Sequence, residues 1–163
     1  MAPPGPAATR TGHGDAVLND LVRPLFSLPT RVYWEDTDAG GVVYHARYVA
    51  YLERARSEWM RTLGHGQQSL IDGLDLVFAV RDMQLDFRRP ARLDDALDVT
   101  VALARVRRAS AEFAQEVRRG DELLVAARVR VAALDAGGFR PRAIPDEMYG
   151  LFKSLESNAE QHR

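Results

Sequence analysis

The sequence predicts an α+β fold in which one long helix packs against a single curved antiparallel sheet. Apolar residues recur at spacings of three and four between Tyr48 and Leu63, which is the period of an amphipathic helix. From Leu76 to Val131 the apolar period changes to two, which indicates strands. The chain has 163 residues, enough for one hydrophobic core, and shows no internal repeat. We therefore expect one domain whose helix and sheet share that core.

Local patterns place the helix and the strand before it. A half-buried strand is expected within FSLPTRVYWED, with Val32 and Trp34 on the same side. The helix that follows is apolar around more than a narrow stripe, so we expect the sheet to wrap around it. Gly64 is expected to end the helix.

Four further strands and a short helix complete the expected domain. The apolar parity slips after Val80, which predicts a bulge in the first of these strands. Gly120-Asp121 forms a two-residue turn between the last two strands, and the four strands are expected to follow one another as a meander. Pro145 opens the short C-terminal helix. The expected boundaries are a flexible tail over 1–24, one domain over 25–156 and a tail over 157–163.

The composition is that of an ordinary globular protein, with 46% hydrophobic and 28% charged residues and a formal net charge of −1. This charge gives no reason to expect nucleic-acid binding. The absence of cysteine excludes disulfides, cysteine-ligated zinc and a cysteine nucleophile. No apolar run approaches the roughly 20 residues that span a bilayer, and the stretch MAPPGPAATRTGHGD lacks the apolar centre of a signal peptide. We therefore expect a cytoplasmic protein without a transmembrane segment.

Three carboxylates stand just ahead of the long helix, in WEDTDAGGVVYH. Asp and Thr in such a place often cap a helix or form a turn. Asp38 is poorly placed as a cap, because two glycines and two valines intervene before the helix. A metal site at Asp36, Asp38 and His45 is the other reading, but the antiparallel strands downstream do not supply the partners of an aspartyl-phosphate site. We expect no metal or other cofactor, and Asp38 is the candidate for chemistry.

His45 and an arginine-rich turn are the other two candidates. His45 is expected to be neutral because a helix N-terminus disfavours positive charge, and its backbone N–H suits developing negative charge. Arg105, Arg107 and Arg108, with Ser110, form either a solvated hairpin tip or a grip for phosphate groups. Phosphate-loop and serine-nucleophile motifs are absent from the sequence.

The string RVYWEDTDAGGVVYHARYVAYLERAR resembles the signature of hotdog-fold acyl-CoA thioesterases of the 4-hydroxybenzoyl-CoA thioesterase type. It is most similar to the bacterial branch associated with the Tol–Pal envelope system. The likeness runs over residues 29–153 and includes FAVRDMQLDFRRPARLDD and PRAIPDEM. It implies a hotdog fold, in which a five-stranded antiparallel sheet wraps a long central helix. It also implies homodimers joined edge to edge, commonly paired into homotetramers, with active sites at the subunit interface.

The resemblance also assigns roles to individual positions. It places the catalytic carboxylate on Asp38 and a second catalytic residue on His45. It places contacts to the coenzyme A phosphates near the turn formed by Arg107, Arg108 and Ser110. Asp38 would act as general base or as nucleophile, while the thioester carbonyl would accept hydrogen bonds from the amides around Val43, Tyr44 and His45.

The implied function is the hydrolysis of acyl-CoA thioesters to free acid and CoA, with acyl carrier protein as a further possible partner. Two alternatives stay open. One is a hotdog hydratase or dehydratase that acts on acyl thioesters with a histidine and a helix carboxylate such as Glu53. The other is a non-catalytic adaptor that binds an acyl carrier or an envelope complex.

Overall fold

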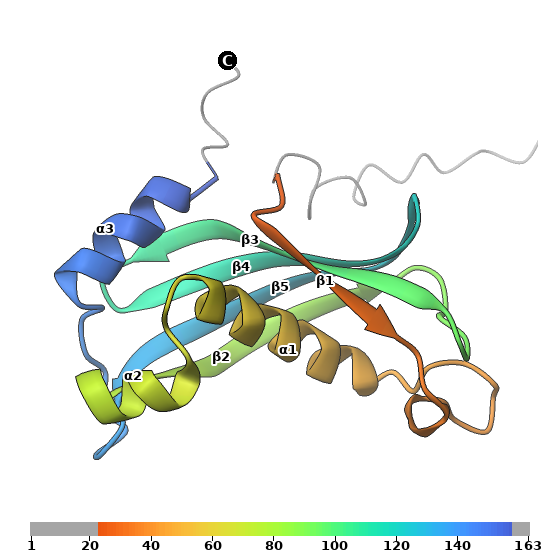
Figure 1. Ribbon diagram of the computed structural model, residues 1–163, viewed down its shortest axis with the longest axis horizontal. Coiled ribbons are helices and arrows are strands. Elements are labelled where there is room, and N and C mark those ends of the chain that lie inside the picture. The colour runs from red at the N-terminus through yellow and green to blue at the C-terminus, as the bar shows by residue number, and fades with distance from the viewer. Residues whose placement is uncertain (1–22, 158–163) are drawn as a thin grey trace, which may run out of the picture.

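The computed structural model describes residues 23–157, in which a five-stranded antiparallel sheet curves around one long helix (Figure 1). The expected α+β class is therefore confirmed, including the short C-terminal helix. The terminal tails expected over 1–24 and 157–163 lie almost entirely outside the described residues.

One strand precedes the first two helices, and four consecutive strands and a last helix follow them. The strands are β1 (Phe26–Arg31), β2 (Leu76–Phe87), β3 (Ala96–Arg107), β4 (Ser110–Arg119) and β5 (Glu122–Asp135). The helices are α1 (Arg47–Thr62), α2 (Gln67–Leu74) and α3 (Asp146–Leu155), with a short 3-10 turn at Trp34–Asp36.

The sheet order is β1-β3-β4-β5-β2, so the expectation of a four-stranded meander is wrong for β2. Only β3, β4 and β5 follow one another as neighbours, while β2 pairs with β5 at the far edge. A period of two identifies a strand but carries no information about its neighbour. Here α1 and α2 carry the chain from β1 past the middle of the sheet to that edge (Figure 1).

Helix α1 supplies the centre of the hydrophobic core. Its buried face includes Tyr51, Leu52 and Trp59, which meet the inward side chains of the sheet. The Trp59 ring packs against Phe113 of β4 and Phe152 of α3, with centroids 5.8 and 5.7 Å apart. Helix α3 thus closes one end of the core. Gly64 follows α1 with φ of +85°, a conformation that favours glycine and ends the helix as predicted.

Two local expectations meet different outcomes. The predicted bulge is confirmed, since the register between β2 and β5 shifts between Val80 and Asp82 and leaves Arg81 as the extra residue. The expectation that Trp34 shares the buried side of Val32 is wrong, because Val32 is fully buried whereas Trp34 is 80% exposed. The chain leaves the sheet after Arg31 and turns into the 3-10 segment, so strand alternation no longer applies at Trp34.

Candidate active site

Asp38 lies in a hydrogen-bonded turn between β1 and α1. The Asp38 amide donates to the Val42 carbonyl at 2.9 Å, and the Gly41 amide donates back to the Asp38 carbonyl at 3.0 Å. A bridge between Thr37 and Val43 closes the base of the turn. The side chain is exposed, and its Oδ1 accepts a hydrogen bond from the Gly40 amide at 2.8 Å. The turn therefore orients one carboxylate oxygen and leaves Oδ2 without a partner among the described residues.

The two glycines of this turn have different tasks. Gly41 has φ of +77°, which a residue with a side chain adopts only with strain. At Gly40, an added Cβ atom would lie 3.0 Å from Oδ1 of Asp38. Gly41 thus makes the turn possible, whereas Gly40 leaves room for the Asp38 carboxylate.

Asp36 holds the same loop from inside the protein. Its side chain is only 3% exposed, and its oxygens accept hydrogen bonds from the Tyr33 amide at 2.8 Å and from Nε of Arg47 at 2.7 Å. Burial alone would raise the pKa of the Asp36 carboxyl, but these hydrogen bonds outweigh burial and keep the pKa below its ordinary value. Asp36 is therefore a charged structural anchor between the loop and the first turn of α1.

The structure narrows the expected set of free amides at the start of α1. The Val43 amide donates to the Ala91 carbonyl and the Tyr44 amide to the Asp36 carbonyl, both at 2.9 Å. Neither amide is available to a substrate in this state. The amides of His45 and Ala46 have no hydrogen-bond partner within residues 23–157. A helix start with such open N–H groups favours an oxyanion.

His45 lies at the rim of an open hollow near this helix start. Its ring packs beside Tyr44 with centroids 4.6 Å apart, and its side chain is exposed. We call this cavity of about 270 Å³ the helix-start hollow; it is lined by Val43, His45, Tyr48, Phe87, Arg88, Arg89 and Pro90. The chain therefore brings Asp38, His45 and an apolar recess to one end of the molecule.

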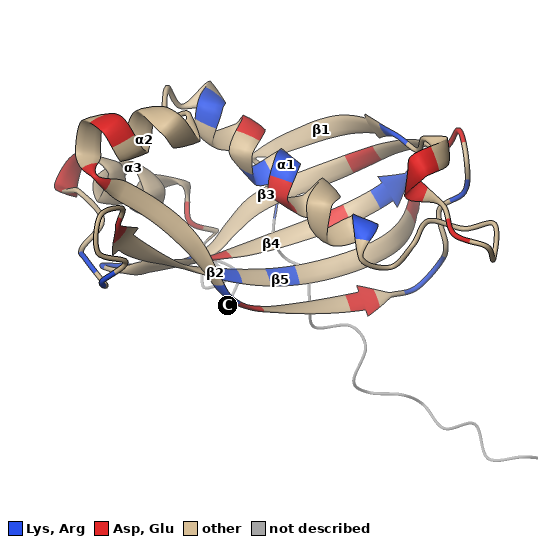
Figure 2. Ribbon diagram, turned by 90° about the horizontal axis from the view of Figure 1, so that it is seen from below, with Lys and Arg blue, Asp and Glu red and all other residues tan. Residues whose placement is uncertain are grey.

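A second cavity, which is polar, lies on the outer face of the sheet. This arginine hollow is small, about 80 Å³, and is lined by Arg81, Arg105, Arg107, Ser110, Ala111, Glu112 and Arg130. Figure 2 shows basic residues on β5, which contributes Arg130. Arg130 is paired with Asp82 at 2.8 Å, whereas Arg81, Arg105 and Arg107 have no ion-pair partner within residues 23–157. The cavity is therefore suited to an anion.

Of the three predicted phosphate contacts, Arg107 and Ser110 line the arginine hollow, and Arg108 points elsewhere. Nη2 of Arg108 is 2.7 Å from Oδ1 of Asp146, and its guanidinium lies 4.4 Å from the centre of the Tyr149 ring. Sequence reasoning missed Arg81 and Arg130. Arg81 could have been found, because it occupies the predicted bulge. Arg130 comes opposite Glu112 only through the pairing of β4 with β5.

The arginine hollow and Asp38 lie at opposite ends of one chain. β3 begins at Ala96, beside the loop that follows β1, and ends at Arg107 in the arginine hollow. With 12 residues, this strand extends over about 35 Å. One chain therefore does not present Asp38 and its own arginine hollow to the same small ligand.

Metal binding and membrane spanning can be examined over residues 23–157. No group of three or more His, Cys, Asp or Glu side chains is arranged to hold a metal ion in this part of the chain. None of its helices has the length and apolar character needed to cross a bilayer.

The sequence itself matches known proteins over this architecture. Residues 40–126 match the family described as the thioesterase superfamily. A Haemophilus influenzae protein named acyl-CoA thioesterase YbgC is 45% identical over 131 residues, which cover 80% of this chain and 96% of that protein. The chain belongs to the thioesterase superfamily. This thioesterase is thus a hydrolase, as the motif resemblance implied.

Other similar proteins agree with this assignment. A protein from Escherichia coli O6:H1 named acyl-CoA thioester hydrolase YbgC is 44% identical over 130 residues, covering 79% of this chain and 96% of that protein. The crystal structure of a probable thioesterase from Bartonella henselae is 37% identical and has a TM-score of 0.71, covering 74% of this chain and 98% of that chain. The hotdog fold of this thioesterase is thereby confirmed.

Proposed function

We propose that this chain hydrolyses acyl-CoA thioesters to free acid and CoA, with Asp38 as the reacting carboxylate. The observation that carries the proposal is the hydrogen-bonded turn that joins Asp38 to a helix start with open amides at His45 and Ala46. The names of relatives that match over 96% of their length support acyl-CoA as the substrate.

The reaction follows from these groups. The thioester carbonyl accepts hydrogen bonds from the His45 and Ala46 amides, which stabilise the oxyanion of the tetrahedral intermediate. A preorganised donor of this kind contributes about 3 to 4 kcal/mol to the transition state. Asp38 either removes a proton from the attacking water or attacks the carbonyl carbon itself. In the second route CoA leaves as the thiolate, and water then cleaves the acyl–Asp38 anhydride.

The position of Glu53 favours hydrolysis over the hydratase alternative. A hydratase needs a histidine and a carboxylate that act on adjacent carbons of one acyl group. Glu53 lies eight residues beyond His45 along the chain, near the end of the second turn of α1. Its carboxylate accepts a hydrogen bond from Ser57 at 2.7 Å and lines a different cavity. Asp38 and His45 share one end of the molecule instead.

The separation of Asp38 from the arginine hollow supports a homodimer as the active unit, assembled further into a homotetramer. β2 is a 12-residue edge strand whose one partner strand within residues 23–157 is β5, so its other edge can pair with a second copy. Pairing of β2 with its counterpart runs the two sheets in opposite directions. The partner's arginine hollow then lies at the same end as Asp38 and can bind the CoA phosphates.

The proposal also covers the cellular location of the activity and the nature of the acyl donor. The absence of cysteine suits the cytoplasm, where we place the activity. The motif resemblance points to a thioesterase of the 4-hydroxybenzoyl-CoA thioesterase type and to a role beside the Tol–Pal envelope system, and it leaves aromatic and aliphatic acyl groups both to be tested. Acyl carrier protein bears the same thioester and is a second donor to test.

A free-thiol release assay tests the central proposal. Aliphatic and aromatic acyl-CoAs and an acyl carrier protein thioester are compared with wild type, Asp38→Asn and Glu35→Gln. Glu35 is the matched control, because its exposed carboxylate stands three residues away and its one ion-pair partner in the described part of the chain is Arg47, at 3.4 Å. We expect release by wild type and Glu35→Gln, and a loss of at least about 100-fold in Asp38→Asn. Equal activity in Asp38→Asn, or no release from any thioester, contradicts the proposal.

A further inference from the structure

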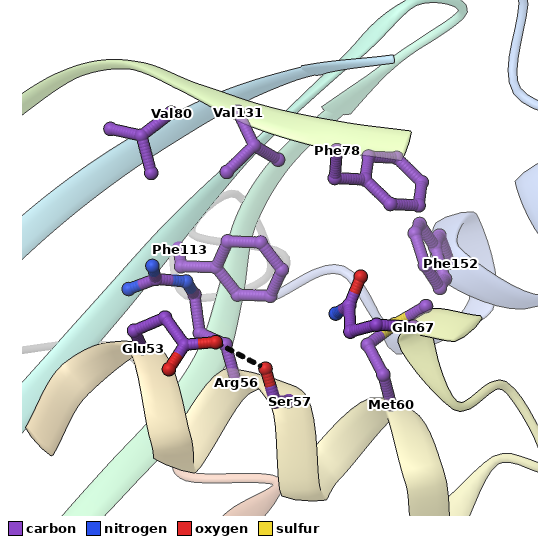
Figure 3. Close-up of a pocket in the computed structure, with 10 residues that line it drawn as sticks. All are labelled: Glu53, Arg56, Ser57, Met60, Gln67, Phe78, Val80, Phe113, Val131 and Phe152. Atoms are coloured by element: carbon purple, nitrogen blue, oxygen red, sulfur yellow. Dashed lines mark hydrogen bonds between the residues drawn. The ribbon is translucent and has the colours of Figure 1, made fainter. Parts of the chain in front are cut away.

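A third cavity lies between α1 and the sheet and has an unusual mixture of walls. This inner hollow of about 220 Å³ is lined by Glu53, Arg56, Ser57, Met60, Gln67, Phe78, Val80, Phe113, Val131 and Phe152. Figure 3 shows Glu53, Arg56 and Ser57 together on α1, with Phe113, Phe78 and Phe152 spread around the rest of the space. The aromatic walls alone would be enough to bind an apolar ligand. The polar side chains in one corner therefore indicate a ligand with a polar group.

Arg56 is the central polar group of this corner. Arg56 is 8% exposed, and its Nη1 donates a hydrogen bond to Oε1 of Gln115 at 2.8 Å. Gln115 is fully buried, and its own amide donates to the Leu52 and Thr100 carbonyls. A guanidinium carries five N–H donors, and this is the hydrogen bond that it makes within residues 23–157. Buried donors of a charged group favour any acceptor that reaches them.

Glu53 balances the charge of Arg56 across the corner. Burial lowers the pKa of the Arg56 guanidinium, and the charge of Glu53 opposes that effect. The Glu53 carboxylate accepts from Ser57 Oγ at 2.7 Å (Figure 3). The corner therefore presents the N–H donors of Arg56 beside a carboxylate acceptor.

The inner hollow lies on the same side of the molecule as the helix-start hollow. Both cavities are lined by α1 and β2: the first by Arg56 and Phe78, the second by Tyr48 and Phe87. At about 220 Å³ the inner hollow is smaller than the roughly 300 Å³ or more of a whole small-molecule site. Its size suits part of a substrate whose thioester lies elsewhere along α1 and β2.

We propose that the inner hollow receives the acyl group and selects acyl groups that carry a neutral oxygen, hydroxyl or keto, remote from the thioester. This inference rests on the proposed thioesterase function. The oxygen accepts hydrogen bonds from Arg56, and a hydroxyl also donates to Glu53. An alkyl end leaves the Arg56 donors unmatched, and a carboxylate end meets the negative charge of Glu53.

Matched substrates test the selectivity. Thiol release is measured on acyl-CoAs of equal chain length that end in methyl, hydroxyl, keto or carboxylate. For wild type we expect kcat/KM to be at least about tenfold higher with the hydroxyl or keto group than with methyl or carboxylate. In Arg56→Met the ratio should fall to near one. Arg54→Met is the control, because Arg54 is on the same helix and is absent from the cavity lining.

This ratio is informative even if Arg56→Met folds poorly, because both substrates are turned over by the same active molecules. Gln67→Leu is a milder second variant at the wall of the inner hollow, and it should reduce the ratio in part. A wild-type ratio near one, or an unchanged ratio in Arg56→Met, overturns the proposal.

A binding measurement separates this inference from the proposed hydrolysis. Trp59 contacts Phe113 and Phe152, which line the inner hollow, and Trp34 is the other tryptophan of the chain. In a Trp34→Phe background, Trp59 fluorescence is titrated with free alkanoic acids and with the matched hydroxy acids. Stronger binding of hydroxy acids that Arg56→Met abolishes supports the site even if no thioester is hydrolysed. Equal binding of both acids contradicts it even if hydrolysis is found.

Discussion

Asp36 and Arg47 are joined by a hydrogen bond of 2.7 Å between Oδ1 and Nε, which ties the loop after β1 to the first turn of α1. Two residues further on, Asp38 is exposed and has one oxygen without a partner in residues 23–157. The two aspartates of D-T-D therefore differ in environment and in task. One holds the loop, and the other remains available for chemistry.

Replacing Asp36 with Asn should lower the free energy of unfolding. The change keeps the shape but removes the charge that binds Arg47, so we expect a loss of about 1 to 3 kcal/mol at neutral pH. Chemical denaturation measures it. Glu35→Gln is the control, since the Glu35 side chain is 74% exposed and its pair with Arg47 should contribute under about 1 kcal/mol. Equal losses in the two variants would remove the distinction.

The stability contributed by Asp36 should depend on pH in the acid range. Its folded pKa lies below the ordinary value, so the contribution is complete above the unfolded pKa of about 3.9 and is lost as pH falls through the folded pKa. The difference in unfolding free energy between wild type and Asp36→Asn should therefore shrink below about pH 4. A difference that stays constant down to about pH 2 argues against a charged Asp36 in the folded state.

Gly40→Ala should impair catalysis more than stability. The added methyl would lie 3.0 Å from Oδ1 of Asp38 and displace the proposed reacting carboxylate. We expect kcat to fall by roughly tenfold or more while the unfolding free energy changes by under about 1 kcal/mol. Gly73→Ala on α2 is the control, because an added Cβ there meets nothing within 4 Å. Wild-type kcat in Gly40→Ala would show that the carboxylate position is unimportant.

Arg107 and Arg108 should differ in their effect on CoA binding. Arg107 lines the arginine hollow, whereas Arg108 pairs with Asp146 on α3. Arg107→Ala should raise KM for acyl-CoA about tenfold, and Arg108→Ala should leave KM near its wild-type value. Neither should affect an acyl-pantetheine, which lacks the nucleotide phosphates. An equal rise in KM for both substrates would place Arg107 outside a phosphate site.

A charge on the open edge of β2 should disrupt the proposed dimer. Val80 is 47% exposed beside the bulge, and a lysine there opposes pairing of two copies. Val80→Lys should give a lower mass in light scattering and lose thiol release. Ser27→Lys changes the other edge strand, β1, and should keep both properties. An unchanged mass in Val80→Lys would exclude β2 pairing.

The local elements were accessible from the sequence because their signals are local. Apolar spacing identified α1 and the strands, and the parity slip after Val80 predicted the bulge that the structure places at Arg81. Helix α2 escaped prediction because its eight residues, QQSLIDGL, have too few apolar positions to establish a period. The position of Asp38 as a carboxylate outside the helix cap also followed from the sequence alone.

Contacts between distant segments could not be read from such signals. The place of β2 at the sheet edge, the coupling of Asp36 to Arg47 and the direction of Arg108 each depend on which residues the fold brings together. The same holds for the buried Arg56–Gln115 pair, whose members lie 59 residues apart. Residue type and spacing were enough for the strands, for α1 and α3, and for choosing Asp38 as the candidate carboxylate. The open amides of His45 and Ala46, the arginines that line one hollow and the cavity beside α1 were decided by tertiary packing, because each depends on partners that spacing along the chain does not encode.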